Sequence, residues 1–181
     1  MRRFALMLAL ALSAAAVLVG SAGSAHSRSS FQVFVEETTS AAPNGLTLVS
    51  ELEGTYNVVG KTASGDGTYE VWAGSTELDH GTFTLTRLIT FQFYGCGEVT
   101  GEDGTPIELP PDWCGGRALF AIHYISSTGG GEGDASYEVN CQIHDPGGQA
   151  PPGTSEGVKA NARGVNFNTH VTGDNLLVML P

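Results

Sequence analysis

Two segments of this chain alternate between hydrophobic and polar residues with a period of two, the period of a β-strand with one buried and one solvated face. They span residues 81–94 and 136–144. The polar positions of the first are mostly threonine, and Arg87 interrupts its apolar face. The apolar positions are Phe83, Leu85, Ile89, Phe91 and Phe93, then Tyr137, Val139, Cys141 and Ile143. Both segments are therefore predicted to be strands of an antiparallel sheet.

Short runs rich in Val, Ile, Thr, Phe and Tyr recur along the chain between clusters of Gly, Asp, Asn and Pro. Residues 64–67, Ser-Gly-Asp-Gly, are predicted to form one of the turns. About nine short strands favour an all-β fold, and we predict an antiparallel β-sandwich, with a closed β-barrel as the alternative. The predicted strands are residues 31–37, 46–52, 56–61, 68–73, 81–94, 117–126, 136–144, 157–171 and 175–180.

Residues 117–126 carry apolar side chains on both faces, which predicts a central strand covered on both sides. The glycine-rich segment 128–134 predicts a hairpin between this strand and residues 136–144. A symmetric turn would place Ala118 opposite His144.

Residues 1–25 have the parts of a secretory signal peptide. Arg2 and Arg3 give a positive start, residues 4–19 are apolar except for one serine, and small residues follow. We predict cleavage at the end of this segment, which leaves residues 26–181 as a single secreted β domain, outside the cell or in its envelope. Because the apolar run is shorter than the ~20 residues of a membrane span, no transmembrane anchor is expected after cleavage.

The composition is acidic, since 8 Lys and Arg against 19 Asp and Glu give a net charge of −11 at neutral pH. Loss of Arg2 and Arg3 with the signal peptide would make the remaining chain more acidic still. Such a surface repels phosphate backbones, so we expect no nucleic-acid partner. The composition does not indicate an oligomeric state.

The chain has three cysteines, so at most one intrachain disulfide can form in an oxidising compartment. If residues 81–94 pair antiparallel with residues 117–126, Cys96 and Cys114 lie at the same end of the sheet. We therefore predict a Cys96–Cys114 disulfide and a buried free thiol at Cys141. The other two pairings and a disulfide to another chain stay open, and the spacing argues against a zinc site.

Catalytic and metal-binding motifs give little support to an enzyme. Residues 153–157 match Gly-x-Ser-x-Gly, but that motif requires a strand that turns into a helix, whereas a proline-rich loop precedes this match and a strand pattern follows it. Acidic residues among glycines, at Asp66, 102–103 and 132–134, would suit calcium, although none has the spacing of a known calcium loop. We expect no cofactor, with calcium as the alternative, and a hydrogen-bonded interior or half-buried role for His123.

Trp72 and Trp113, with Asp112 beside the latter, are the predicted ligand-binding residues, because secreted β domains hold sugars and apolar ligands with aromatic side chains. We predict a non-catalytic protein that binds an extracellular ligand or partner, with glycan, lipid and protein left open. One alternative is a small all-β extracellular hydrolase with paired carboxylates in a cleft, one of them with a raised pKa. The other is a structural, envelope-associated protein in which Cys141 forms a cross-link.

Overall fold

The structure is a computed structural model, which describes residues 29–100, 104–143 and 155–181. Nearly all of these residues lie in strands and none lies in an α-helix, which confirms the predicted all-β antiparallel fold. The predicted signal peptide, residues 1–25, and His144 lie outside the described residues. The strands are β1 (Ser30–Ala41), β2 (Leu46–Asn57), β3 (Thr62–Ala73), β4 (Thr76–Cys96), β5 (Glu98–Thr100), β6 (Pro106–Glu108), β7 (Trp113–Ser126), β8 (Glu132–Cys141), β9 (Gly157–Ala162), β10 (Val165–Phe167) and β11 (Thr169–Met179).

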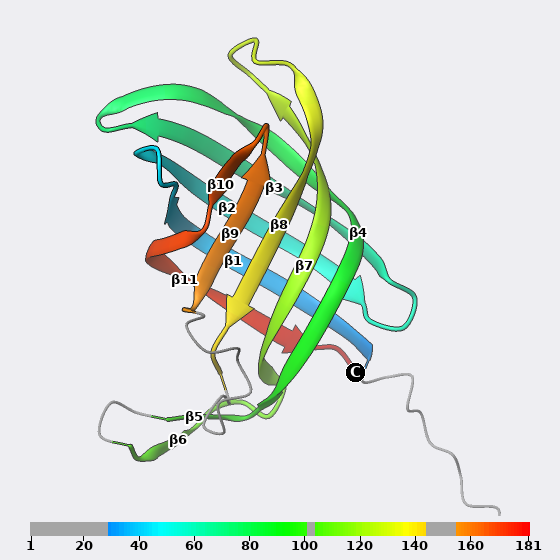
Figure 1. Cartoon of the computed structure of the whole chain (residues 1–181). Helices are drawn as coiled ribbons and strands as arrows, with labels where there is room; N and C mark the ends of the chain where they lie inside the picture. Colours follow the sequence, from blue (N-terminus) through cyan, green and yellow to red (C-terminus); the bar gives the residue numbers. More distant parts are fainter. Residues whose placement is uncertain (1–28, 101–103, 144–154) are drawn as a thin grey trace, which may run out of the picture.

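Nine strands form one antiparallel sheet in the order β10-β9-β8-β7-β11-β1-β2-β3-β4, and β4 also pairs with β7. One edge of β7 pairs with β4, and the other pairs with β8 and, at its first residues, with β11. The sheet curves until β8 and β9 lie across the core from β1 and β2 (Figure 1). Hydrogen bonds cross that core from Ser40 Oγ to the Val158 carbonyl, at 2.5 Å, and between the Ser50 and Tyr137 hydroxyls, at 2.9 Å. Two layers thus face each other within one hydrogen-bonded sheet.

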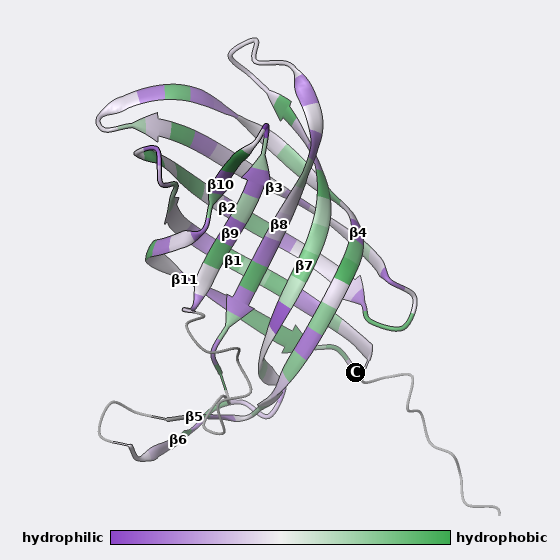
Figure 2. Cartoon of the chain, viewed as in Figure 1, coloured by the Kyte–Doolittle hydropathy of each residue, from purple (hydrophilic) through white to green (hydrophobic). Residues whose placement is uncertain are grey.

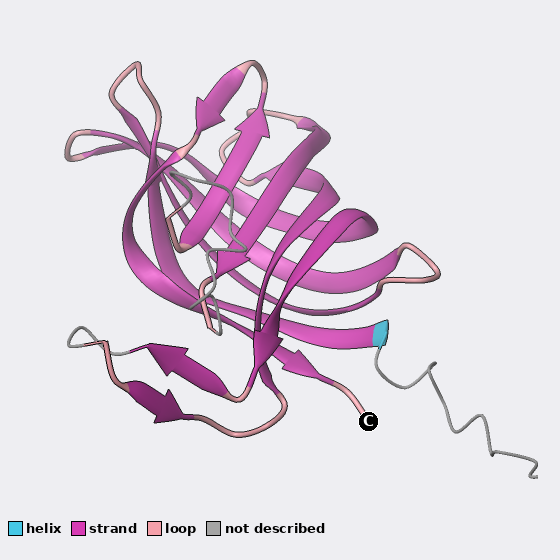
Figure 3. Cartoon of the chain, turned by 60° about the horizontal axis from the view of Figure 1, so that its bottom comes forward, coloured by secondary structure: helices cyan, strands magenta, loops and turns pink. Residues whose placement is uncertain are grey.

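The two remaining strands, β5 and β6, form a small separate sheet. It lies at the end of the molecule opposite the β3–β4 and β7–β8 hairpins (Figure 3). The large sheet therefore has a hairpin end and a β5–β6 end.

Glycines inside strands explain two errors in the predicted breaks between strands. The predicted turn at residues 64–67 lies within β3, and residues 53–55, which separate the predicted strands 46–52 and 56–61, lie within β2. The turn between β2 and β3 is at residues 58–61. A Cβ on Gly65 would lie 2.4 Å from the Glu53 carbonyl oxygen, and one on Gly67 would lie 2.3 Å from the Phe83 ring. These glycines are therefore required by close packing across the sheet, and not by a reversal of the chain.

The predicted strand at residues 157–171 is wrong, because the structure divides it among β9, β10 and the start of β11. β9 and β10 form a hairpin whose two turn residues, Arg163 and Gly164, have φ of 52° and 78°. Positive φ at both central positions matches the twist of the flanking strands in a two-residue hairpin turn. The turn was not predicted because the first of these positions is usually Asn, Asp or Gly, and here it is arginine.

Irregular pairing in β4 explains how its apolar face continues past Arg87. The register with β7 shifts between Leu85 and Arg87 and again between Leu88 and Thr90. Leu85 and Leu88 are both buried, although residues three positions apart lie on opposite faces of a regular strand. Arg87 between them is exposed. The shifts thus move the buried face by one residue and leave the charge in solvent.

The predicted register of the β7–β8 hairpin is wrong, because Ala118 pairs with Val139 and not with His144. The chain reverses within residues 127–131, where Gly129 and Gly131 have positive φ, so β8 begins at Glu132. In this register the apolar faces coincide, with Phe120 opposite Tyr137.

β7 is central in the sheet, but only one of its faces is fully covered. Ala118, Phe120, Ile122 and Tyr124 are buried on the core side, while Ile125 on the other side is 51% exposed. The prediction of cover on both sides is therefore wrong for the second face.

Buried side chains from both layers form one hydrophobic core. The alternation of hydrophobic and hydrophilic residues is visible along the strands in Figure 2. The largest fully buried side chains of this core are Tyr137, Phe83, Phe120, Leu88 and Leu177. The candidate site lies between the layers near the hairpin end.

Candidate functional site

A cavity of about 200 Å³ lies between the two layers of the sheet and opens to solvent at the hairpin end. Its walls come from seven strands, β2, β3, β4, β7, β8, β9 and β10. Its apolar lining residues are Leu46, Leu48, Val71, Phe83, Ile122, Ala135, Ala160, Ala162, Val165 and Phe167. Three alanines among them, one on β8 and two on β9, leave the space that larger side chains would fill.

One hydrogen-bonded pair supplies the polar groups deep in the cavity. The hydroxyls of Ser50 and Tyr137 lie 2.9 Å apart, and both residues are buried. Burial raises the pKa of Tyr137 well above its usual range, so its phenol stays protonated. One of these hydroxyls donates and the other accepts, so the depth of the cavity presents a mainly apolar surface with one further hydroxyl donor.

Asp79, near the start of β4, is the only carboxylate among the described residues that line this cavity. Its Oδ1 accepts hydrogen bonds from Ser126 Oγ at 2.5 Å and Thr128 Oγ1 at 2.6 Å, and its Oδ2 accepts one from Tyr69 Oη at 3.3 Å. Partial burial opposes ionisation, but these hydrogen bonds outweigh it and lower the pKa of Asp79. The rim thus carries a negative charge at neutral pH.

Arg163, in the β9–β10 turn, supplies the opposite charge at the rim. Its Nε donates to Tyr124 Oη at 2.7 Å, and its Nη2 donates to the carbonyl of Gly130 in the β7–β8 turn. Its Cζ lies 5.2 Å from the centre of the Tyr124 ring, within range of a cation–π contact. The hydrogen bond to Tyr124 raises the pKa of Arg163. This side chain therefore joins two turns across the mouth of the cavity.

The structure does not bring the predicted ligand-binding tryptophans together. Trp72 lies near the hairpin end of β3, half-buried, and its Nε1 donates to Glu70 at 2.9 Å. Asp112 precedes β7 and Trp113 begins it, beside the disulfide and far from the hairpin end. Trp113 is 37% exposed. None of the three lines the cavity, and their ligand-binding role stays a prediction.

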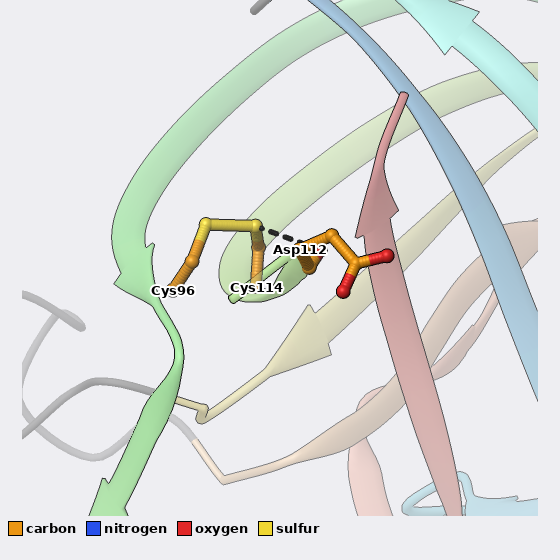
Figure 4. The surroundings of a disulfide bond; sticks show 3 residues. All are labelled: Cys96, Asp112 and Cys114. Carbon is orange, nitrogen blue, oxygen red and sulfur yellow. Dashed lines mark hydrogen bonds between the residues drawn. A yellow bond between two sulfur atoms is a disulfide. The ribbon is translucent and has the colours of Figure 1, made fainter. Parts of the chain in front are cut away.

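The predicted Cys96–Cys114 disulfide is confirmed. It joins the end of β4 to the start of β7, where the two cysteines pair in the sheet. Figure 4 shows it beside Asp112, whose carbonyl oxygen lies 3.2 Å from Cys114 Sγ and accepts a hydrogen bond from the Met179 amide at 2.8 Å. The bridge thus stabilises the place where β4, β7 and β11 meet.

Cys141 is free and buried, and we expect it to be unreactive in the folded protein. Burial raises the pKa of its thiol to about 12, so very little thiolate exists at pH 8. Alkylation by iodoacetamide should be at least about a hundred-fold slower in the folded than in the guanidinium-unfolded protein. Mass spectrometry should then find one labelled cysteine per unfolded chain, and rapid labelling of the folded protein would contradict this burial.

No group of three or more His, Cys, Asp and Glu side chains in residues 29–100, 104–143 and 155–181 is arranged to hold a metal ion. The predicted calcium candidates at 132–134 instead flank His123, whose Nδ1 lies 3.1 Å from Asp134 Oδ1. Asp66 lines a separate shallow cavity with several glutamates, and residues 102–103 lie outside the described residues. His123 is half-buried and hydrogen-bonded.

A carboxylate with a raised pKa does occur, but away from the cavity. Burial raises the pKa of Glu156, which precedes β9 and lies near Asp174. Neither residue is among those that line the cavity between the layers.

Comparisons with known proteins found no match to a protein-family model, to a curated protein or to a solved structure. Within the described ranges, the structure contains no helix of the length and apolar character that crossing a membrane requires.

Proposed function

We propose that this protein binds a small, largely apolar molecule in the cavity between its two layers and carries out no reaction on it. The observation that supports this most directly is the cavity itself, which is lined mainly by aliphatic and aromatic side chains and opens at a polar rim. Sites for small molecules commonly combine an apolar wall with a few polar groups that orient the ligand. Of the ligand classes left open by the sequence, this lining favours a lipid-like molecule over a glycan or a protein.

The size of the cavity supports a ligand over imperfect packing. Protein interiors are packed as densely as organic crystals, and empty space is destabilising. An engineered apolar cavity of about 150 Å³ binds benzene, so this one has room for a somewhat larger molecule.

The chemistry of the lining favours binding over catalysis. Asp79 has a lowered pKa and is already hydrogen-bonded to three donors, whereas a general acid needs a raised pKa. The described residues of the lining include neither a histidine nor a cysteine. Glu156, which has the raised pKa that a hydrolase would need, is not part of the lining. We therefore favour a carrier or sensor over the hydrolase alternative.

Location is part of this proposal. We infer that residues 26–181 act as a single domain outside the cytoplasm, after removal of the signal peptide predicted at residues 1–25. The Cys96–Cys114 disulfide supports an oxidising compartment. The envelope-associated alternative, in which Cys141 forms a cross-link, is disfavoured because that thiol is buried.

Isothermal titration calorimetry with n-octanol, n-octanoate and n-octylamine tests this function. Burial of the alkyl tail, at about 0.8 kcal/mol per CH₂, should give at least one of them a Kd between roughly ten micromolar and one millimolar. The heat capacity change on binding should be negative, because apolar surface leaves water. An oligosaccharide such as maltotriose is the control and should not bind. Failure of all three alkyl compounds to bind would overturn the proposal.

A further inference from the structure

Two opposite charges lie close together at the mouth of the cavity, since Asp79 and Arg163 both line it. Asp79 Oδ2 and Arg163 Nη1 would each lie 3.1 Å from a Cβ placed on Gly130, so the two groups are near neighbours on either side of that glycine. Among the ion pairs of the described residues, none joins Asp79 to Arg163 directly. The polar end of a ligand at the mouth of the cavity therefore lies near both a carboxylate and a guanidinium.

Both groups are held in place and still have hydrogen-bonding capacity. Asp79 Oδ1 is occupied by Ser126 and Thr128, whereas Oδ2 accepts only the longer bond from Tyr69, at 3.3 Å. A carboxylate oxygen has about two acceptor positions, so Oδ2 can take a second donor. In Arg163, Nε and Nη2 donate to Tyr124 and Gly130, and the Nη1 hydrogens remain for a ligand.

We propose that the ligand carries a neutral hydroxyl group at its polar end, which donates to Asp79 Oδ2 and accepts from Arg163 Nη1 while its apolar part fills the cavity. The inference rests on the proposed function and adds the class of ligand. A carboxylate would pair with Arg163 but meet the charge of Asp79. An ammonium group would pair with Asp79 but meet Arg163. Only a group that both donates and accepts satisfies the two sides without an unpaired charge.

The three alkyl compounds test this selectivity because they share a tail and differ in their polar end. At pH 7, n-octanol should bind at least about ten-fold more tightly than n-octanoate and n-octylamine. Equal affinities, or a preference for either charged compound, would overturn the hydroxyl assignment and leave the proposed function standing. Binding of none of them would remove the proposed function and this inference together.

Substitutions at the rim should change the selectivity in opposite directions. Asp79→Asn keeps the shape of the side chain and removes its charge, so n-octanoate should gain at least about ten-fold relative to n-octanol. Arg163→Gln should give the corresponding gain to n-octylamine. Glu77→Gln is the matched control, because Glu77 lies two residues from Asp79 but contacts His80 and does not line the cavity. Unchanged ratios in a folded Asp79→Asn or Arg163→Gln protein would overturn the inference.

Thermal melts accompany each titration and show which variants are folded. If Asp79→Asn loses its cooperative melt, the Arg163→Gln protein decides the question, since it lacks the other of the two charges. A gain by n-octylamine in that protein supports the inference, and no gain overturns it.

Discussion

Replacement of Ala160 by leucine should abolish ligand binding and raise the stability of the fold. Ala160 lies on β9, pairs with Tyr137 of β8 and Phe167 of β10, and lines the cavity. The added carbons would occupy the space of the ligand, so n-octanol affinity should fall at least about ten-fold. Cavity filling commonly adds about 0.5–2 kcal/mol to the free energy of unfolding, which should raise the Tm by a few degrees. Calorimetry and thermal melts measure the two effects.

Ala73→Leu is the matched control, because Ala73 is exposed at the end of β3 and does not line the cavity. It should change neither the affinity nor the Tm appreciably. Wild-type affinity in Ala160→Leu would exclude this cavity as the binding site. Loss of binding together with a large drop in Tm would mean that overpacking had disrupted the layers, and a smaller residue such as valine would then be needed at this position.

Removal of the Cys96–Cys114 disulfide should cause the largest loss of stability. The bridge joins residues with a sequence separation of 18, and closure of such a loop stabilises the folded state by about 3 kcal/mol in the chain-entropy model. For a protein of this size, the Tm of the Cys96→Ala/Cys114→Ala variant should fall by roughly 6–12 °C. Thermal and urea unfolding, each monitored by circular dichroism, measure the change.

A reductant provides the control for that experiment. Dithiothreitol should lower the Tm of the wild-type protein by a similar amount and leave the double variant unchanged. Equal Tm values for the oxidised and reduced wild-type protein would contradict a stabilising role. Cys141→Ala separates the contribution of the bridge from that of a buried sulfur atom, since Cys141 is buried but forms no disulfide.

The strand content could be predicted because alternation is a local signal, but the turns could not all be placed. A glycine is read as a turn when no other information is present, yet Gly65 and Gly67 lie in the middle of a strand. A side chain at these two positions would clash with Glu53 and Phe83, which lie on neighbouring strands. Such a requirement is visible only once the pairing of the strands is known.

The register of the β7–β8 hairpin could not be fixed from the sequence, because residues 117–126 are apolar on both faces. Residues that pair directly lie on the same face, so the apolar face of residues 136–144 could meet either face of that strand. The predicted pairing of Ala118 with His144 would place Leu119 opposite Ile143, whereas the observed pairing of Ala118 with Val139 joins the two buried faces. Only the burial of one face in the folded protein decides between the two registers.

The candidate site was missed because no single segment signals it. Its walls are aliphatic and aromatic residues of seven strands, each of a kind common in strands. Its two charges lie far apart in the sequence, at Asp79 and Arg163, and one of them occupies a turn that the sequence reading placed inside a strand. The prediction of Trp72 and Trp113 as ligand-binding residues relied on large aromatic side chains. The space for a ligand is instead created by small residues.

Pairing between the first and last strands also determines when the chain can fold. β1 pairs with β11 along most of its length, and Thr38 Oγ1 donates to the Asp174 carbonyl 136 positions later in the sequence. During synthesis, β1 therefore has no partner on that edge until β11 has left the ribosome. Contacts of such long sequence separation slow folding. A chain that completes its sheet only after its last strand emerges therefore stays unfolded longer.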